Sequence, residues 1–124
     1  MRIGPFIIAV LLTASFALAH HSNAAFDGDK VVVLKGTVTQ WKWSNPHVWI
    51  VLSVDDDKGG KAEWAIEGRT PGQLVRAGWS RSTLKPGDVI TVDFSPAKDG
   101  TLTGLLTRVR LADGTVLGQA PPAQ

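Results

Sequence analysis

The sequence predicts a mainly β domain, a small five-stranded barrel with one short helix. Three observations lead to this prediction. Five segments are rich in β-branched and aromatic residues or alternate between apolar and polar residues, as strands do. Clusters of turn residues separate most of these segments at short intervals. One segment, between the third and fourth strands, has the start and stop signals of a helix.

The first three predicted strands occupy residues 31–43, 47–54 and 61–67. Gly36 interrupts the first strand, as a bulge or bend would. Pro46 ends it, because proline has a fixed φ and no amide donor. Alternate residues of a strand point to opposite faces. In the second strand one face therefore contains Val48, Ile50, Leu52 and Val54, and the other contains His47, Trp49, Val51 and Ser53. The segment DDDKGG at 55–60 forms a hairpin turn.

The helix is predicted in the segment TPGQLVRAGW, residues 70–79. Thr70 can cap its start, Pro71 suits its first position, and Gly78 suits its end. The fourth strand covers residues 89–94 and the fifth residues 102–111, with a turn at 113–114. The order β-β-β-α-β-β is that of an OB-fold, a five-stranded Greek-key barrel. Another small β-barrel, or a sandwich with one helical turn, is the alternative.

The first nineteen residues are predicted to be a cleavable signal peptide. Arg2 supplies a short positive region, residues 6–18 are apolar but too few to span a bilayer comfortably, and Ala17 and Ala19 are the small residues that a signal peptidase reads. Residues 20–118 then form a single OB-like domain, and residues 119–124 a disordered tail. We expect a periplasmic or secreted protein without stable membrane insertion after cleavage. The alternatives are an uncleaved membrane anchor and a cut after Ala24, which would remove His20 and His21.

The composition excludes several classes of function. The chain has no cysteine, which rules out disulfides, cysteine-ligated zinc, covalent haem attachment and thiol catalysis. Once Arg2 is removed, twelve Lys and Arg stand against eleven Asp and Glu, so no basic excess argues for nucleic acid. Glu63 and Glu67 share a strand face, but nothing beside them resembles a substrate cleft. We therefore predict a non-enzymatic protein that binds no nucleic acid.

Two of the three histidines, His20 and His21, directly follow the predicted cleavage point. A cut before His20 would leave an amine and a ring nitrogen that chelate one metal ion, and His47 could add another imidazole. Such nitrogen ligands in a planar arrangement suit Cu(II), and the N-terminal histidine resembles the histidine brace of copper-dependent monooxygenases and some periplasmic copper carriers. The first hypothesis is a binding module with a copper site of His20, His21 and His47. The alternative is a frayed polar terminus and a hydrogen-bonded turn histidine. A copper oxidase is a third and weaker hypothesis, because the domain is small and no substrate groove can be named.

Five tryptophans and no tyrosine are a further distinctive feature. Trp41 and Trp43 are predicted on the first strand's outer face, and Trp49 shares the polar side of the second strand with His47. If these strands pair, the rings cluster on the outside of the barrel, where OB-folds bind oligomers by stacking. The second hypothesis is a metal-free interaction protein that binds an envelope protein or polymer through Trp41, Trp43 and Trp49. The alternative is that these rings are covered and belong to the core, as expected for Trp64 and Trp79.

Several motifs spread over residues 20–117 show a family resemblance: HHS followed by FDGDK, LKGTVTQW, NPH with a following WI, WAIEG, LVRAGW, LKPGD, and PAKDG with TLTG. In these motifs the chain resembles an uncharacterised family of small exported bacterial proteins, defined by a domain of unknown function. The resemblance implies a single exported β domain. It implies no established activity, so no catalytic residue is carried over from it.

Overall fold

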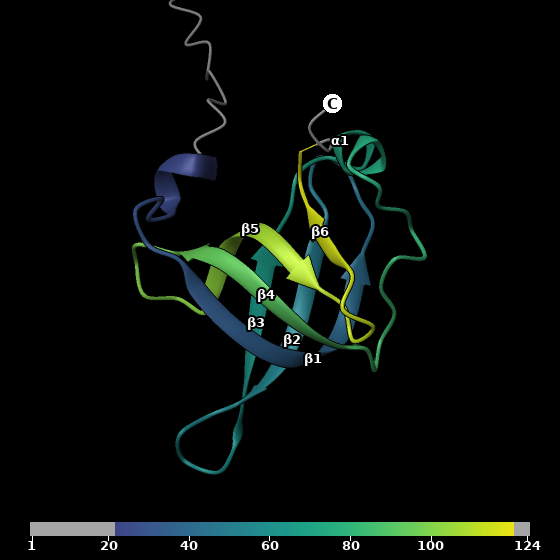
Figure 1. The fold of residues 1–124 in the computed structure, drawn as a ribbon. Coiled ribbons are helices and arrows are strands. Elements are labelled where there is room, and N and C mark those ends of the chain that lie inside the picture. The colour runs from purple at the N-terminus through teal and green to yellow at the C-terminus, as the bar shows by residue number, and fades with distance from the viewer. Residues whose placement is uncertain (1–21, 121–124) are drawn as a thin grey trace, which may run out of the picture.

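The computed structural model describes residues 22–120. These residues form a 3-10 turn, six strands and one short α-helix (Figure 1). In chain order the elements are η1 (Ser22–Ala25), β1 (Val32–Lys42), β2 (Trp49–Asp55), β3 (Lys61–Glu67), α1 (Pro71–Arg76), β4 (Val89–Pro96), β5 (Thr103–Arg110) and β6 (Val116–Gly118). The predicted signal peptide, which ends at residue 19, and both His20 and His21 lie outside the described residues. Within residues 22–120, no helix has the length and apolar character needed to cross a membrane.

Five of the strands close into a barrel. β1 pairs antiparallel with both β2 and β4, β2 pairs with β3, and β4 pairs with β5. A parallel pairing between residues 65–67 of β3 and residues 103–105 of β5 closes the ring. α1 follows β3 and lies at one end of the barrel (Figure 1). The prediction of a mainly β, five-stranded barrel with one short helix between the third and fourth strands is confirmed.

β1 contributes to both sides of the barrel, since its first half pairs with β4 and its second half with β2. Gly36 keeps its regular pairing with β4. A Cβ at this position would lie 2.8 Å from the carbonyl oxygen of Ser53, so glycine permits a close approach of β2. The bulge lies later in the strand, where the β1–β2 register shifts between Val38 and Gln40 and leaves Thr39 as the extra residue.

α1 begins where the sequence predicts. The Thr70 hydroxyl accepts a hydrogen bond from the Gln73 amide at 3.2 Å, and Gln73 Oε1 accepts one from the Thr70 amide at 3.3 Å, which together form a capping box. The helix ends at Arg76, and Gly78, with φ of 95°, follows its cap and reverses the chain, as the sequence predicts. The Trp79 amide then donates to the Leu74 carbonyl at 2.9 Å, which closes the helix end.

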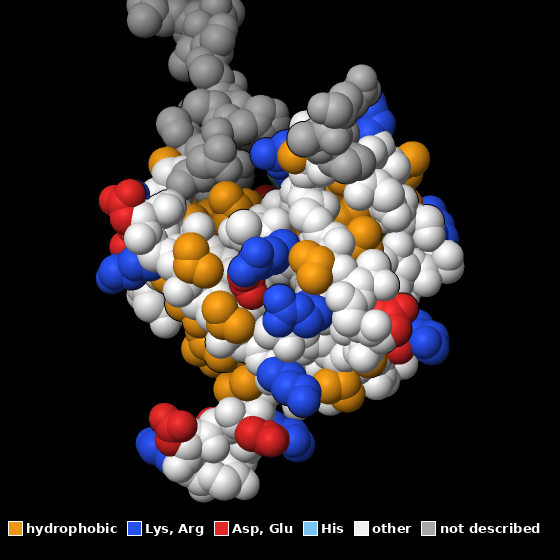
Figure 2. Space-filling view, in the orientation of Figure 1, with side chains coloured by type: hydrophobic (Ala, Val, Ile, Leu, Met, Phe, Trp, Pro, Cys, Tyr) orange, Lys and Arg blue, Asp and Glu red, His pale blue; other side chains and the backbone are white. Residues whose placement is uncertain are grey.

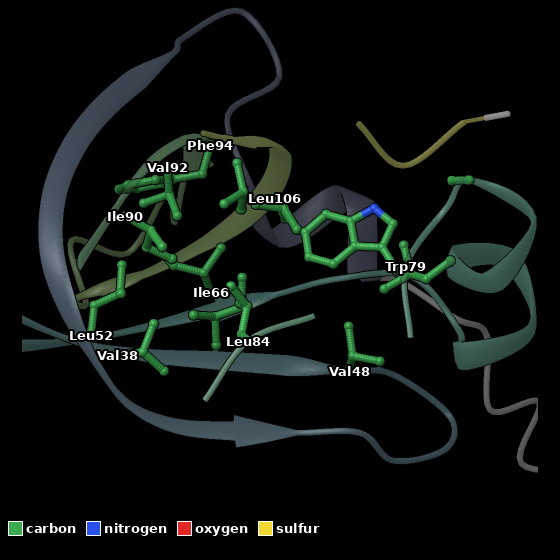
Figure 3. Packing of buried hydrophobic residues seen from close by; sticks show 14 of the residues in the cluster. Val38, Val48, Leu52, Ile66, Trp79, Leu84, Ile90, Val92, Phe94 and Leu106 are labelled. Atoms are coloured by element: carbon green, nitrogen blue, oxygen red, sulfur yellow. The ribbon is translucent and has the colours of Figure 1, made fainter. Parts of the chain in front are cut away.

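The core fills the barrel and the end covered by α1 (Figure 3). Trp79, which is 2% exposed, lies among these buried side chains, and its Nε1 donates to the carbonyl of Gly118 at 2.7 Å. Burial of apolar side chains is the main stabilising contribution in a chain that has no disulfides. Buried members from the five barrel strands include Val38, Ile50, Leu52, Ile66, Ile90, Val92, Phe94, Leu106 and Val109.

β6 is an addition that the sequence does not predict. It is a three-residue strand that pairs with β5 alone. After β6, Gln119 Oε1 accepts from the Arg69 amide at 2.7 Å, and Gln119 Nε2 donates to the carbonyl of Leu106. The chain is therefore fixed to the barrel through Gln119, the residue at which the sequence predicts that a disordered tail begins. Residues 121–124 of that predicted tail lie outside the described residues.

Candidate functional site

His47 lies in the loop between β1 and β2, beside the end of β3. Two backbone hydrogen bonds extend the β2–β3 pairing past the ends of the strands: the Val48 amide donates to the Arg69 carbonyl at 3.1 Å, and the Gly68 amide donates to the Val48 carbonyl at 2.8 Å. A Cβ at Gly68 would lie 2.5 Å from Cγ2 of Val48, so this approach requires glycine. The Ser44 hydroxyl, which donates to the His47 carbonyl at 2.9 Å, fixes the loop on its other side.

The His47 ring contacts two groups of β3 and its extension. Nδ1 lies 3.0 Å from the carbonyl oxygen of Gly68 and 3.6 Å from Oε1 of Glu67. A carbonyl oxygen only accepts hydrogen bonds, so we assign the proton of the neutral ring to Nδ1, which leaves the lone pair on Nε2. The side chains of His47 and Glu67 are 26% and 10% exposed. The pair therefore lies at the margin of the core, where Nε2 is the ring nitrogen left for a ligand.

This arrangement fits a metal ligand. Histidines that bind metal usually donate their second ring N–H to a carbonyl or carboxylate, which fixes the ring and raises the basicity of the ligating nitrogen. His47 has a carbonyl in this position and the Glu67 carboxylate close by. The same contacts also satisfy a purely structural histidine, which is the alternative that the sequence offers.

The other predicted ligands, His20 and His21, lie outside the described residues. Within residues 22–120, no group of three His, Cys, Asp or Glu side chains could bind a metal ion. Asp27 and Asp29, weighed as oxygen ligands, form a local turn in which the Asp29 amide donates to Asp27 Oδ1 at 3.2 Å. Of the three predicted nitrogen ligands, His47 alone lies within the described residues.

The structure does not bring the three predicted tryptophans together on one outer face. Trp41 is paired with Ile50, which is fully buried, and paired residues lie on the same side of a sheet. Trp49 is paired with Lys42 and with Glu67 and lies on the opposite side. The reason is the bulge at Thr39: one extra residue reverses the inward and outward alternation of the rest of β1.

Trp41 and Trp43 instead pack against the core. The Trp41 ring lies 5.5 Å from that of Trp43 and stacks on Trp79 at 5.9 Å with an interplanar angle of 30°. Its Nε1 donates to the carbonyl of Arg81 at 2.9 Å. Trp64 also packs against the core, 5.3 Å from the Phe94 ring. Of the three predicted platform residues, Trp49 alone remains on the outer face, partly exposed.

Sequence reasoning missed the contact between Glu67 and His47. The signal was present in the hairpin sequence. A turn at residues 55–60 pairs Trp49 with Glu67. His47 lies two residues before Trp49 and on the same face of the strand, so this pairing places it next to Glu67. From the sequence alone, Glu67 is instead considered together with Glu63, which lies on the same face of β3. The structure thus gathers His47, Trp49 and Glu67 on the outer side of the β2–β3 hairpin.

Comparison with solved structures confirms the OB-like fold. The chain resembles two crystal forms of Rim1, from the mitochondrial single-stranded DNA binding proteins of S. cerevisiae. For one form the TM-score is 0.52 at 10% identity, covering 77% of this chain and 98% of that chain. For the other it is 0.51 at 13% identity, covering 67% and 94%. At these identities the likeness shows the fold alone.

No curated protein matches the sequence. A family model does match, and it covers residues 9–108, which include β1 to β4 and most of β5. The chain therefore belongs to DUF6152, a family of unknown function.

Proposed function

We propose that the chain is an exported, non-enzymatic binding module that binds a copper-type metal ion through His47, His20 and His21. The observation that carries the proposal is the orientation of His47. Its Nδ1 is occupied by the Gly68 carbonyl beside the Glu67 carboxylate, which leaves Nε2 as a fixed, basic ligand. Nitrogen ligands of this kind suit copper.

The N-terminal arm supports the proposal because it is attached to the barrel a few residues after His20 and His21 in the sequence. The Lys98 amide donates to the Ala25 carbonyl at 2.9 Å, and Phe26 is 7% exposed. His21 directly precedes the turn η1, which ends at Ala25. A ligand near a fixed point loses less conformational entropy on binding than one on a long free segment.

The test is a titration of the chain that begins at His20 with Cu(II), in which calorimetry measures the affinity. The His47→Ala variant is expected to bind at least about tenfold more weakly, since it loses one of three nitrogen ligands. Lys42→Ala, an exposed change at the end of β1, is the matched control and should leave affinity unchanged. Equal affinity of the wild type and His47→Ala would remove His47 from the site, and no copper binding would end the proposal.

A second candidate function rests on Trp49. This ring lies on the outer side of β2 and β3, the face on which OB-folds bind oligomeric ligands, and does not pack against the core. Rim1 is described as a single-stranded DNA binding protein, but here Lys42 shares this face with two carboxylates, Glu63 and Glu67. Binding of phosphate chains requires several basic contacts. A polymer without a phosphate backbone, or a protein, suits this face better than nucleic acid.

The second candidate is tested by sedimentation with purified peptidoglycan in buffer that contains a metal chelator. Stacking of one aromatic ring contributes about 1–3 kcal/mol in ligands of this kind. Trp49→Ala is therefore expected to weaken binding about tenfold or more, while His47→Ala has little effect. Binding that disappears with chelator would favour the metal hypothesis instead.

A further inference from the structure

A second surface of the barrel has an unusual composition. It is the outer side of β4, β5, β6 and the first half of β1, which we name the β4–β5 face. Figure 2 shows Lys and Arg side chains in the middle of this face with hydrophobic side chains around them. Three of the six large hydrophobic side chains that are exposed among the described residues belong to it, Val33 (58%), Val116 (48%) and Val89 (43%), and a fourth, Val31 (64%), directly precedes β1.

Strand pairing arranges the side chains of this face in rows. One row contains, across β1, β4, β5 and β6, Lys35, Thr91, Arg110 and Val116. The neighbouring row contains Val33, Asp93, Arg108 and Gly118. Side chains that are directly opposite in a sheet lie on the same side and about 5 Å apart. Cationic and apolar side chains are therefore interleaved over one continuous surface.

The face carries an excess of positive charge. Asp93 is its carboxylate, and Arg108 Nε donates to Asp93 Oδ2 at 2.5 Å, so these two charges balance. Lys35 and Arg110 have no carboxylate partner among residues 22–120. Together with Thr91 they line a shallow hollow of about 250 Å³. Two free cations beside a hydroxyl fit an anionic oxygen group such as a phosphate.

We propose that the β4–β5 face docks on the surface of an anionic lipid bilayer. Lys35 and Arg110 would contact lipid phosphates, and the four exposed valines would enter the boundary between headgroups and acyl chains. A free phosphate or an acidic polymer would use the cations and leave the valines in water, whereas a lipid surface uses both. Binding of this kind is peripheral and reversible, and it does not depend on the metal site at His47.

The experiment is co-sedimentation of the chain beginning at His20 with vesicles of equal parts phosphatidylglycerol and phosphatidylcholine, compared with pure phosphatidylcholine vesicles. Each Lys or Arg near an anionic surface contributes enough to change partitioning about fivefold. The double variant Lys35→Ser, Arg110→Ser is thus expected to partition about thirty-fold more weakly. The matched control, Lys58→Ser with Lys98→Ser, removes the same charge from two exposed positions outside the face and should change partitioning far less.

A second pair of substitutions tests the apolar contribution. Val33→Ser with Val116→Ser leaves every charge in place and is expected to weaken partitioning at least about fivefold, because two apolar contacts are lost. Both side chains are exposed, so circular dichroism should show an unchanged fold. Three outcomes would overturn the proposal. The first is no sedimentation with anionic vesicles, and the second is an equal loss of partitioning in the Lys35, Arg110 variant and in the Lys58, Lys98 control. The third is no effect of the valine substitutions. The last would show that the cations alone attract the vesicles, as they would attract any anionic polymer.

Discussion

Gly104 is a position at which the barrel has no room for a side chain. It lies in β5 against the ring of Phe94, which is fully buried, and a Cβ at this position would overlap that ring. Core positions without free space respond to added atoms by shifting neighbours, at a cost of about 1–3 kcal/mol.

Gly104→Ala is expected to lower the free energy of unfolding by about 2–3 kcal/mol, measured by urea denaturation. Gly72→Ala is the matched control, since a Cβ at Gly72 meets nothing within 4 Å. That change should be neutral or slightly stabilising, by up to about 1 kcal/mol. Equal effects of the two substitutions would show that Gly104 does not lie against Phe94.

Asp88 makes the barrel's stability depend on pH. Its carboxylate accepts hydrogen bonds from the Lys85 ammonium at 2.8 Å and the Lys85 amide at 3.0 Å, and the ammonium bond lowers the pKa of Asp88 below its ordinary value. A carboxyl group whose pKa is lower in the folded state stabilises that state above its unfolded pKa and loses this contribution as the pH falls through the folded pKa.

The wild type is therefore expected to be more stable than Asp88→Asn near neutral pH, by less than about 1 kcal/mol because the Lys85 side chain is exposed to solvent. The difference should shrink as the pH falls below the ordinary carboxyl value of about 4. Thermal unfolding of both proteins over this range measures it. A difference that grows on acidification would contradict the assigned hydrogen bonds.

At the scale of elements, the bulge in β1 decides which tryptophans belong to the core. Trp41 lies inward, opposite Ile50 and stacked on Trp79, whereas Trp49 lies on the other side of the sheet. Trp41→Ala is expected to destabilise the fold by about 3 kcal/mol, and Trp49→Ala by much less. Denaturation of the two variants measures this contrast, and a reversed order would show that the bulge is misplaced.

The same bulge shows where sequence reasoning stops. Period-2 patterns, turn residues and the cap at Thr70 predict the five barrel strands and the helix, because these signals are local. The position of a bulge depends on how two strands pair, so alternation counted along the sequence placed Trp41 and Trp43 on the wrong face. β6 has three residues and is stabilised by distant partners such as Trp79. The sequence of β6 itself therefore contains no signal that predicts a strand.

At the scale of the whole molecule, two surfaces with different chemistry lie on one barrel. The end near His47 and Glu67 presents a partly buried imidazole, and the β4–β5 face presents exposed cations and exposed valines. The parallel pairing of β3 with β5 closes the barrel and fixes both surfaces in one body. Neither surface could be assembled from the sequence alone, because each draws residues from segments far apart in the chain.

The mature N-terminus and copper binding can be measured on one sample, the protein purified from the periplasm of expressing cells. Its N-terminus is determined by sequencing and intact mass, and the same sample is titrated with Cu(II) and followed by electron paramagnetic resonance. We predict a chain that begins at His20 and binds one copper ion through nitrogen ligands, with binding lost when the terminal amine is acetylated. A chain that begins at Ala25, or one that begins at His20 and binds no copper, would contradict the metal site.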